Sequence, residues 1–293
     1  VDKANAARLM WKELGVEKRI EYLKEIHEVL SGRREDVAKL ITSEMGKPLK
    51  ESVEEVNNHL SEFEFMFKGA LMAFADEITH EDDKSTHRIV FEPWGTACVI
   101  TPWNFPFGMA MWGIVPNLLA GNTVVFKISE ECPLMGRLIE DAFSSLPDGV
   151  FAAVHGDGRV GQKLAESDID LIWFTGSSKV GQSLYKIAAE KFIPVILEMG
   201  GSNPCVVFDD PDIGTICNER FWNCGQVCDA IKRLIVHESL FDDVVSNLRT
   251  VVESKLSAIL WTRRLISLVF PRGASSSFLI LKLRTLSIRV RKS

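Results

Sequence analysis

The sequence lacks features that define several classes of protein. No uninterrupted apolar run reaches the roughly 20 residues of a membrane helix, which excludes a membrane-spanning helix. The six cysteines show no disulfide-framework spacing, a usage that favours a reducing compartment. The first residues, Val1 to Asn5, carry neither an initiating Met nor a signal-peptide pattern. We therefore expect a cytoplasmic protein whose natural N-terminus lies upstream.

Acidic residues are missing from the last part of the chain. All 40 Asp and Glu residues lie at or before Glu253, whereas 255–293 holds nine Lys or Arg. The net charge of −6 is therefore the sum of −15 over residues 1–254 and +9 over residues 255–293. The strongly negative charge of residues 1–254 disfavours nucleic acid as a partner. Pro271 and Gly273 would interrupt an amphipathic membrane-binding helix. We interpret 255–293 as an aberrant basic tail, of frameshifted or mistranslated origin, on a truncated chain.

The chain changes from helices to alternating strands and helices. Apolar residues recur at helical spacing through the first eighty residues, and 78–100 reads as extended. The strands expected beyond that are 97–101, 123–127, 150–155, 170–175, 193–198 and 205–208, and the helices are 108–120, 132–145, 159–166 and 179–192. Strands separated by helices of this length predict an α/β fold with a parallel sheet covered on both faces.

Two glycine-rich loops compete as a phosphate-binding site. Residues 156–161 fit the pattern G-x-G-x-x-G between a strand and a helix, where free backbone N–H groups can hold a pyrophosphate. The acid expected at the end of the following strand is absent, so an ordinary turn remains the competing interpretation. Residues 176–181 offer hydroxyls and free amides in the same kind of place. Neither loop decides the question by itself.

Charged residues follow the strand expected at 123–127. Lys127 ends that strand and Glu130 follows shortly after it. The carboxyl ends of strands are where open α/β sheets bind ligands, so both side chains could hold a ribose. A solvated Lys and Glu in a loop is the competing interpretation.

Cys228 is a candidate nucleophile. Cys224 and Cys228, in a segment expected to be helical on both sides, could face one metal ion, but no nearby His completes a zinc site, and we expect no metal. An isolated cysteine is most often a small buried hydrophobe, whereas a nucleophile needs a positioned base. Glu198, at the end of a strand and in an apolar setting that would raise its pKa, is the candidate general base.

Five ordered motifs resemble those of the aldehyde dehydrogenase superfamily over roughly residues 1–253, and Gly46-Lys47-Pro48 fits upstream. The motifs are Pro102-Trp103-Asn104-Phe105-Pro106, Lys127-Ile128-Ser129-Glu130, Phe174-Thr175-Gly176-Ser177 with Gly181, Leu197-Glu198-Met199-Gly200-Gly201 and Gly225-Gln226-Val227-Cys228. The resemblance implies NAD(P)-dependent oxidation of an aldehyde to an acid. Cys228 would form a thiohemiacetal and then a thioester, Asn104 and the Cys228 N–H would hold the oxyanion, and Glu198 would activate water.

The resemblance also implies a cofactor site and a domain organisation. The residues expected to contact the cofactor are Ile100, Trp103, Lys127, Glu130, Gly176, Ser177 and Gly181. Glu130 favours NAD over NADP, because an acid there would repel a 2′-phosphate. We expect a Rossmann-type NAD-binding domain (1–76 and 93–197), an oligomerisation hairpin (77–92) and a partial catalytic domain (198–254). Family members suggest a homodimer or homotetramer.

Two departures from the family pattern affect the expected substrate. Ser202 stands where Lys is common, and Asp229 stands where Thr is frequent. Both residues resemble those found in the branch of the family that acts on succinate semialdehyde and other small hydrophilic aldehydes. The absence of the family's later half leaves two alternatives. The chain would be an inactive fragment that still binds nucleotide, or an interaction protein that pairs with intact homologues through the hairpin.

Overall fold

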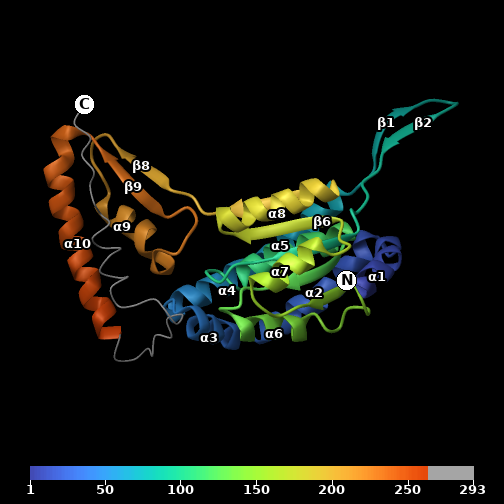
Figure 1. The fold of residues 1–293 in the computed structure, drawn as a ribbon. Coiled ribbons are helices and arrows are strands. Elements are labelled where there is room, and N and C mark those ends of the chain that lie inside the picture. Colours follow the sequence, from blue (N-terminus) through green and yellow to red (C-terminus); the bar gives the residue numbers. More distant parts are fainter. Residues whose placement is uncertain (263–293) are drawn as a thin grey trace.

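The computed structural model describes the backbone of residues 1–262 and the side chains of residues 1–252. A helix-covered central sheet forms the main body, and a smaller unit with α9 and α10 lies to one side of it (Figure 1). Among the described residues, no helix is long and apolar enough to cross a bilayer.

The first 73 residues form the helices expected from their spacing. They are α1 (Asp2–Glu13), α2 (Gly15–Gly32), α3 (Arg34–Met45) and α4 (Leu49–Ala73). Leu23, Ile26 and Leu30 form one fully buried stripe of α2, as three- and four-residue spacing requires. Gly46 ends α3 in the left-handed conformation (φ 82°), and the chain then turns through Lys47 into α4.

Five parallel strands form the central sheet, in the order β5-β4-β3-β6-β7. They are β3 (Thr96–Ile100), β4 (Thr123–Lys127), β5 (Phe151–Ala153), β6 (Leu171–Gly176) and β7 (Val195–Met199). Alternate side chains of β3 enter two different cores: Ala97 and Val99 pack with the N-terminal helices, and Cys98 and Ile100 pack on the opposite face. Both faces of the sheet are therefore covered, and the predicted α/β class is confirmed.

Helices connect the successive strands of this sheet. They are α5 (Gly108–Ala120), α6 (Pro133–Ala142), α7 (Gly158–Glu166) and α8 (Ser178–Lys191). The chain moves outward from β3 to β4 and β5, then returns to place β6 and β7 on the other side of β3. This reversal puts the topological switch point of the sheet between β3 and β6, where ligands bind in open α/β sheets.

The segment 77–92 contains a separate antiparallel pair, β1 (Glu77–Glu81) and β2 (Thr86–Ile89). Every residue of both strands is exposed. The pair projects away from the central sheet (Figure 1). Its expected part in oligomerisation stays a prediction.

A smaller parallel pair, β8 and β9, follows the sheet. Its elements are β8 (Asn203–Val207), α9 (Ile213–Phe221), η1 (Trp222–Gly225), β9 (Ile231–Val236), η2 (Glu238–Leu240) and α10 (Phe241–Thr262). Helix α10 continues across the domain boundary expected at residue 254. Residues 263–293, the greater part of the expected basic tail, lie outside the described residues.

Candidate active site

The switch point brings together the segments expected to hold the cofactor. Strands β3, β4 and β6 end side by side at Ile100, Lys127 and Gly176. Lys127 is buried, and its Nζ donates to the Ile128 carbonyl (2.9 Å) and lies 3.5 Å from a Glu130 oxygen. The Glu130 side chain is half exposed. A buried cation beside an accessible carboxylate is an arrangement that fits a sugar diol.

Both glycine-rich loops lie at this same edge of the sheet. Ser177 is the N-cap of α8, and its hydroxyl accepts from the Val180 N–H (3.4 Å). A Cβ built on Gly161 would lie 3.3 Å from Cδ of Lys127, so the first loop closely approaches the expected ribose site. The first residue of that loop, Gly156, has φ +144°, and a side chain there would collide with Val160. The donor groups fit a dinucleotide, with either loop available to the phosphates.

Cys228 lies in an exposed loop after a distorted turn. Asn223 and Cys224, inside η1, have left-handed backbones (φ 52° and 56°). Cys224 and Cys228 are both exposed. The expectation of helical structure after Cys228 is wrong, because strand β9 begins at Ile231 and pairs with β8. Cys224 and Cys228 therefore do not share one helix face.

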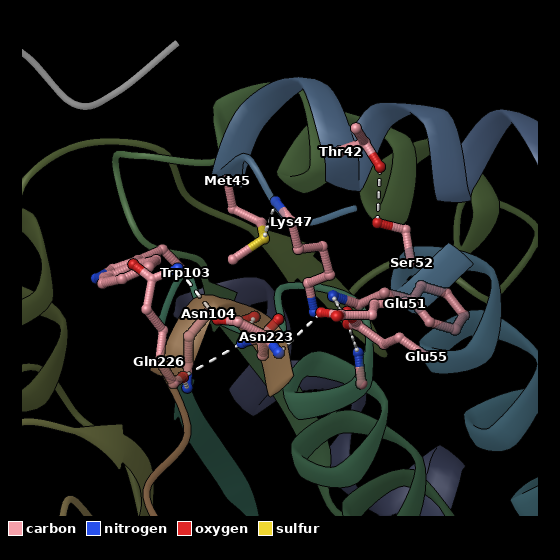
Figure 2. A network of polar contacts seen from close by, with 12 residues as sticks. Thr42, Met45, Lys47, Glu51, Ser52, Glu55, Trp103, Asn104, Asn223 and Gln226 are labelled. Carbon is pink, nitrogen blue, oxygen red and sulfur yellow. Dashed lines mark hydrogen bonds and ion pairs between the residues drawn. The ribbon is translucent and has the colours of Figure 1, made fainter. Parts of the chain in front are cut away.

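The Asn104 loop and the Cys228 loop are hydrogen-bonded to each other. Nδ2 of Asn104 donates to the Gln226 carbonyl (2.8 Å), and Nδ2 of Asn223 donates to the Asn104 carbonyl (2.9 Å). Figure 2 shows these three side chains converging between the two loops. Phe105 and Val227 pack together beneath them. Asn104 is therefore bonded to the Cys228 loop at Gln226, which precedes Cys228 by two residues.

The segment after Glu198 also contacts the Cys228 loop. The Gly201 N–H donates to the Cys228 carbonyl (3.2 Å). Lys232 joins the same two segments, since its Nζ donates to the carbonyls of Gly201 (2.7 Å) and Cys228 (2.9 Å). The expectation that Glu198 lies in an apolar setting is wrong: the side chain ends β7 and is exposed.

A buried ion pair underlies the two loops. Nζ of Lys47 lies 2.6 Å from Oε2 of Glu55, and both side chains have 0% exposure. Nζ also lies 4.0 Å from the centre of the Phe105 ring. Burial lowers the pKa of Lys47, and the charge and hydrogen bond of Glu55 oppose that shift.

Sequence reasoning missed several residues that organise this site. Lys47 stands between Gly and Pro and is followed by two acids one helical turn apart, which is a usable signal for a buried ion pair. Nothing in the sequence marked Asn223. Lys232 resembled an ordinary surface cation, because its partners are backbone carbonyls.

Comparisons with known proteins agree with this architecture. A model of the aldehyde dehydrogenase family matches residues 1–257. A D-glyceraldehyde dehydrogenase (NADP(+)) of Thermoplasma acidophilum is 33% identical over 257 residues, which cover 84% of this chain and 52% of the relative. The mitochondrial succinate-semialdehyde dehydrogenase of Oryza sativa subsp. japonica is 32% identical over 262 residues, which cover 87% of this chain and 50% of the relative.

A solved structure shares the fold. The crystal structure of betaine aldehyde dehydrogenase from Staphylococcus aureus in complex with NAD+ superposes with a TM-score of 0.81 at 29% identity, covering 86% of this chain and 52% of that one. The chain thus spans about half the length of the relatives that it matches.

Proposed function

Because the chain belongs to the aldehyde dehydrogenase family, we propose that it serves the NAD(P)-dependent oxidation of an aldehyde to a carboxylic acid, with Cys228 as nucleophile. The observation that carries the proposal is the joining of three segments by hydrogen bonds. Asn104 bonds the Cys228 loop at Gln226, and Gly201, three residues after Glu198, bonds Cys228 itself. These bonds join the segments that carry the proposed amide, thiol and carboxylate, and this supports the proposal.

In the proposed reaction the Cys228 thiolate adds to the aldehyde carbon, and the carbonyl oxygen becomes an oxyanion. The Asn104 amide carries two N–H groups, of which one is directed at the Gln226 carbonyl. The second is the proposed oxyanion donor, together with the Cys228 N–H. Donors held in place before the reaction stabilise developing charge without reorganisation. This step makes a thiohemiacetal on Cys228.

Bound NAD would supply the hydride acceptor that turns the thiohemiacetal into a thioester. Lys127 and Glu130 are the proposed partners of the adenine ribose, and Ser177 and the backbone near Trp103 those of the pyrophosphate. Ile100, Gly176 and Gly181 would line the same site. The exposed Glu130 carboxylate favours NAD by repelling a 2′-phosphate.

Glu198 is the proposed general base for thioester hydrolysis. It would take a proton from water, which attacks the thioester carbon and displaces the Cys228 thiolate. Its exposed position gives it access to water. The products are the carboxylic acid and free Cys228.

The proposed substrates are small hydrophilic aldehydes, succinate semialdehyde among them. Ser202 and Asp229 support this choice, since both replace residues common in other branches of the family. A relative named succinate-semialdehyde dehydrogenase is among the matches. The exposed pair β1–β2 is the proposed contact for a homodimer or homotetramer. All six cysteines lie among the described residues and none of them forms a disulfide, which supports a cytoplasmic location.

A second candidate function is nucleotide binding without turnover. It is favoured by the exposure of both Cys228 and Glu198, because a site open to water weakens electrostatic stabilisation. In that case pairing with an intact homologue through β1–β2 would remain the chain's contribution.

Two measurements separate these functions. NADH formation is followed at 340 nm with succinate semialdehyde and other short aldehydes, and NAD binding is measured by calorimetry. Aldehyde-dependent NADH that is lost in Cys228→Ala and retained in the matched variant Cys224→Ala supports oxidation. NAD binding without NADH formation supports the second candidate. Unchanged turnover in Cys228→Ala would reject Cys228 as nucleophile.

A further inference from the structure

The buried Lys47–Glu55 pair has contacts that an ordinary core ion pair does not need. Oε2 of Glu55 meets Lys47, while Oε1 accepts from the backbone N–H groups of Phe107 (3.1 Å) and Gly108 (3.0 Å). These are the first N–H groups of α5, which have no partner within the helix. Glu55 therefore fixes the start of α5 immediately after the loop that carries Asn104.

A second acid on the same helix reaches the other loop. Glu51 precedes Glu55 by one turn of α4, so the two side chains lie on one face. Oε2 of Glu51 accepts from the Asn223 backbone N–H (2.8 Å), at the left-handed turn that leads to Cys228. Figure 2 shows Lys47, Glu51 and Glu55 beside Asn104 and Asn223. One helical turn thus contacts both loops of the candidate active site.

We propose that Lys47, Glu51 and Glu55 form a positioning network, which holds the oxyanion donor Asn104 and the nucleophile loop of Cys228 in register. Lys47 is the central residue, since it pairs with Glu55 and lies against Phe105, the neighbour of Asn104. None of the three acts on the substrate. The inference rests on the proposed function only for the roles of Asn104 and Cys228.

The test is hydrogen–deuterium exchange of the purified chain, followed by mass spectrometry on peptides covering 103–109 and 222–228. Lys47→Met leaves the Glu55 carboxylate buried without its counter-charge, which is one of the more damaging single changes. We expect exchange in both peptides to rise about tenfold, with β4 unchanged. Lys50→Met is the matched control, because it breaks an exposed pair with Glu54 on the same helix.

A pH series distinguishes positioning by charge from simple loss of packing. In Lys47→Met the buried Glu55 carboxylate lacks its counter-charge, and protonation removes that buried charge, so loosening should diminish as pH falls from 8 to 5. The other titratable groups around this pair are Glu51, His59, Cys132 and Cys224. The double variant Lys47→Met with Glu55→Gln keeps these four groups and loses only the Glu55 charge. It should therefore regain protection from hydrogen–deuterium exchange and lose the pH dependence.

Glu51→Ala is a milder variant that should loosen 222–228 alone. The network is contradicted if Lys47→Met leaves 222–228 unchanged, or if it loosens every peptide, β4 included, without relief in the double variant. Exchange is measured without aldehyde or cofactor. The exchange experiment can therefore be interpreted even if the chain does not oxidise aldehydes. The Cys228→Ala experiment can likewise be interpreted even if Lys47→Met leaves exchange unchanged.

Discussion

Asn223 is the residue whose replacement best tests the link between the two active-site loops. It is fully buried, has a left-handed backbone, and donates to the carbonyls of Asn104 (2.9 Å) and Gln226 (3.2 Å). In Asn223→Ala the two lost hydrogen bonds cost about 1 kcal/mol each. Ala in a left-handed conformation costs a further ~1–2 kcal/mol, since Asn tolerates that region better.

One feature of Asn223 works in the opposite direction. Its Oδ1 is buried and has no hydrogen-bond partner among the described residues, so removing it recovers ~1–3 kcal/mol. The net loss in the free energy of unfolding should be about 0–3 kcal/mol, so the difference between two substitutions is the sharper test. Asn223→Gly loses the same hydrogen bonds without the strain. It should be about 1 kcal/mol more stable than Asn223→Ala, because relief of strain exceeds the unfolded-state entropy that Gly adds.

Urea denaturation monitored by circular dichroism measures these differences. Asn57→Ala, at an exposed position of α4, is the matched control and should change stability by less than about 0.5 kcal/mol. A higher free energy of unfolding in Asn223→Ala than in the wild type would refute the reasoning, and equal values for the Ala and Gly variants would refute the strain contribution.

Three further predictions concern the cofactor, the core and the thiols. Glu130→Ser should narrow the preference for NAD by removing repulsion of a 2′-phosphate; tighter calorimetric binding of NADP to the unmodified chain would overturn this. Gly108→Ala should lower stability by about 1–3 kcal/mol, because its Cβ would lie 2.0 Å from Nε2 of the buried His59; an unchanged melting temperature would count against the packing described. Burial raises the pKa of the Cys98 thiol to about 12, so at pH 8 iodoacetamide should label exposed Cys224 rapidly and Cys98 only on unfolding; equal labelling rates would disprove this.

The sequence predicts the central sheet well because its signals are local. Strands β3 and β4 are short apolar runs between helix-length segments. Apolar strands that are covered by helices on both faces form a parallel sheet. The N-terminal helices follow from apolar spacing for the same reason. Three of the motifs, at Lys127, Phe174 and Leu197, lie at the carboxyl end of a strand, and the motif of Cys228 lies in a loop before β9.

The parts of the site that escaped prediction depend on contacts between distant segments. Lys47 is followed by Pro48 and reads as a solvated loop residue, yet it is buried through Glu55 and Phe105. The left-handed turn at Asn223 is held by Glu51, 172 residues away. Glu198 was expected in an apolar setting because its neighbours in the sequence are apolar, but β7 is an edge strand whose side chains are largely accessible. Spacing along the chain carries no information on such contacts.

In the proposed reaction Cys228 carries the substrate as a thioester that Glu198 helps water to release. Glu198→Gln, incubated with NAD and succinate semialdehyde, quenched in acid and digested, tests this directly by mass spectrometry. We predict that the peptide containing Cys228 gains the mass of the succinyl group, that the gain requires NAD, and that the unmodified chain accumulates less of it. An acyl group found on Cys224 instead, or no acyl group on Cys228 in either protein, would contradict the account.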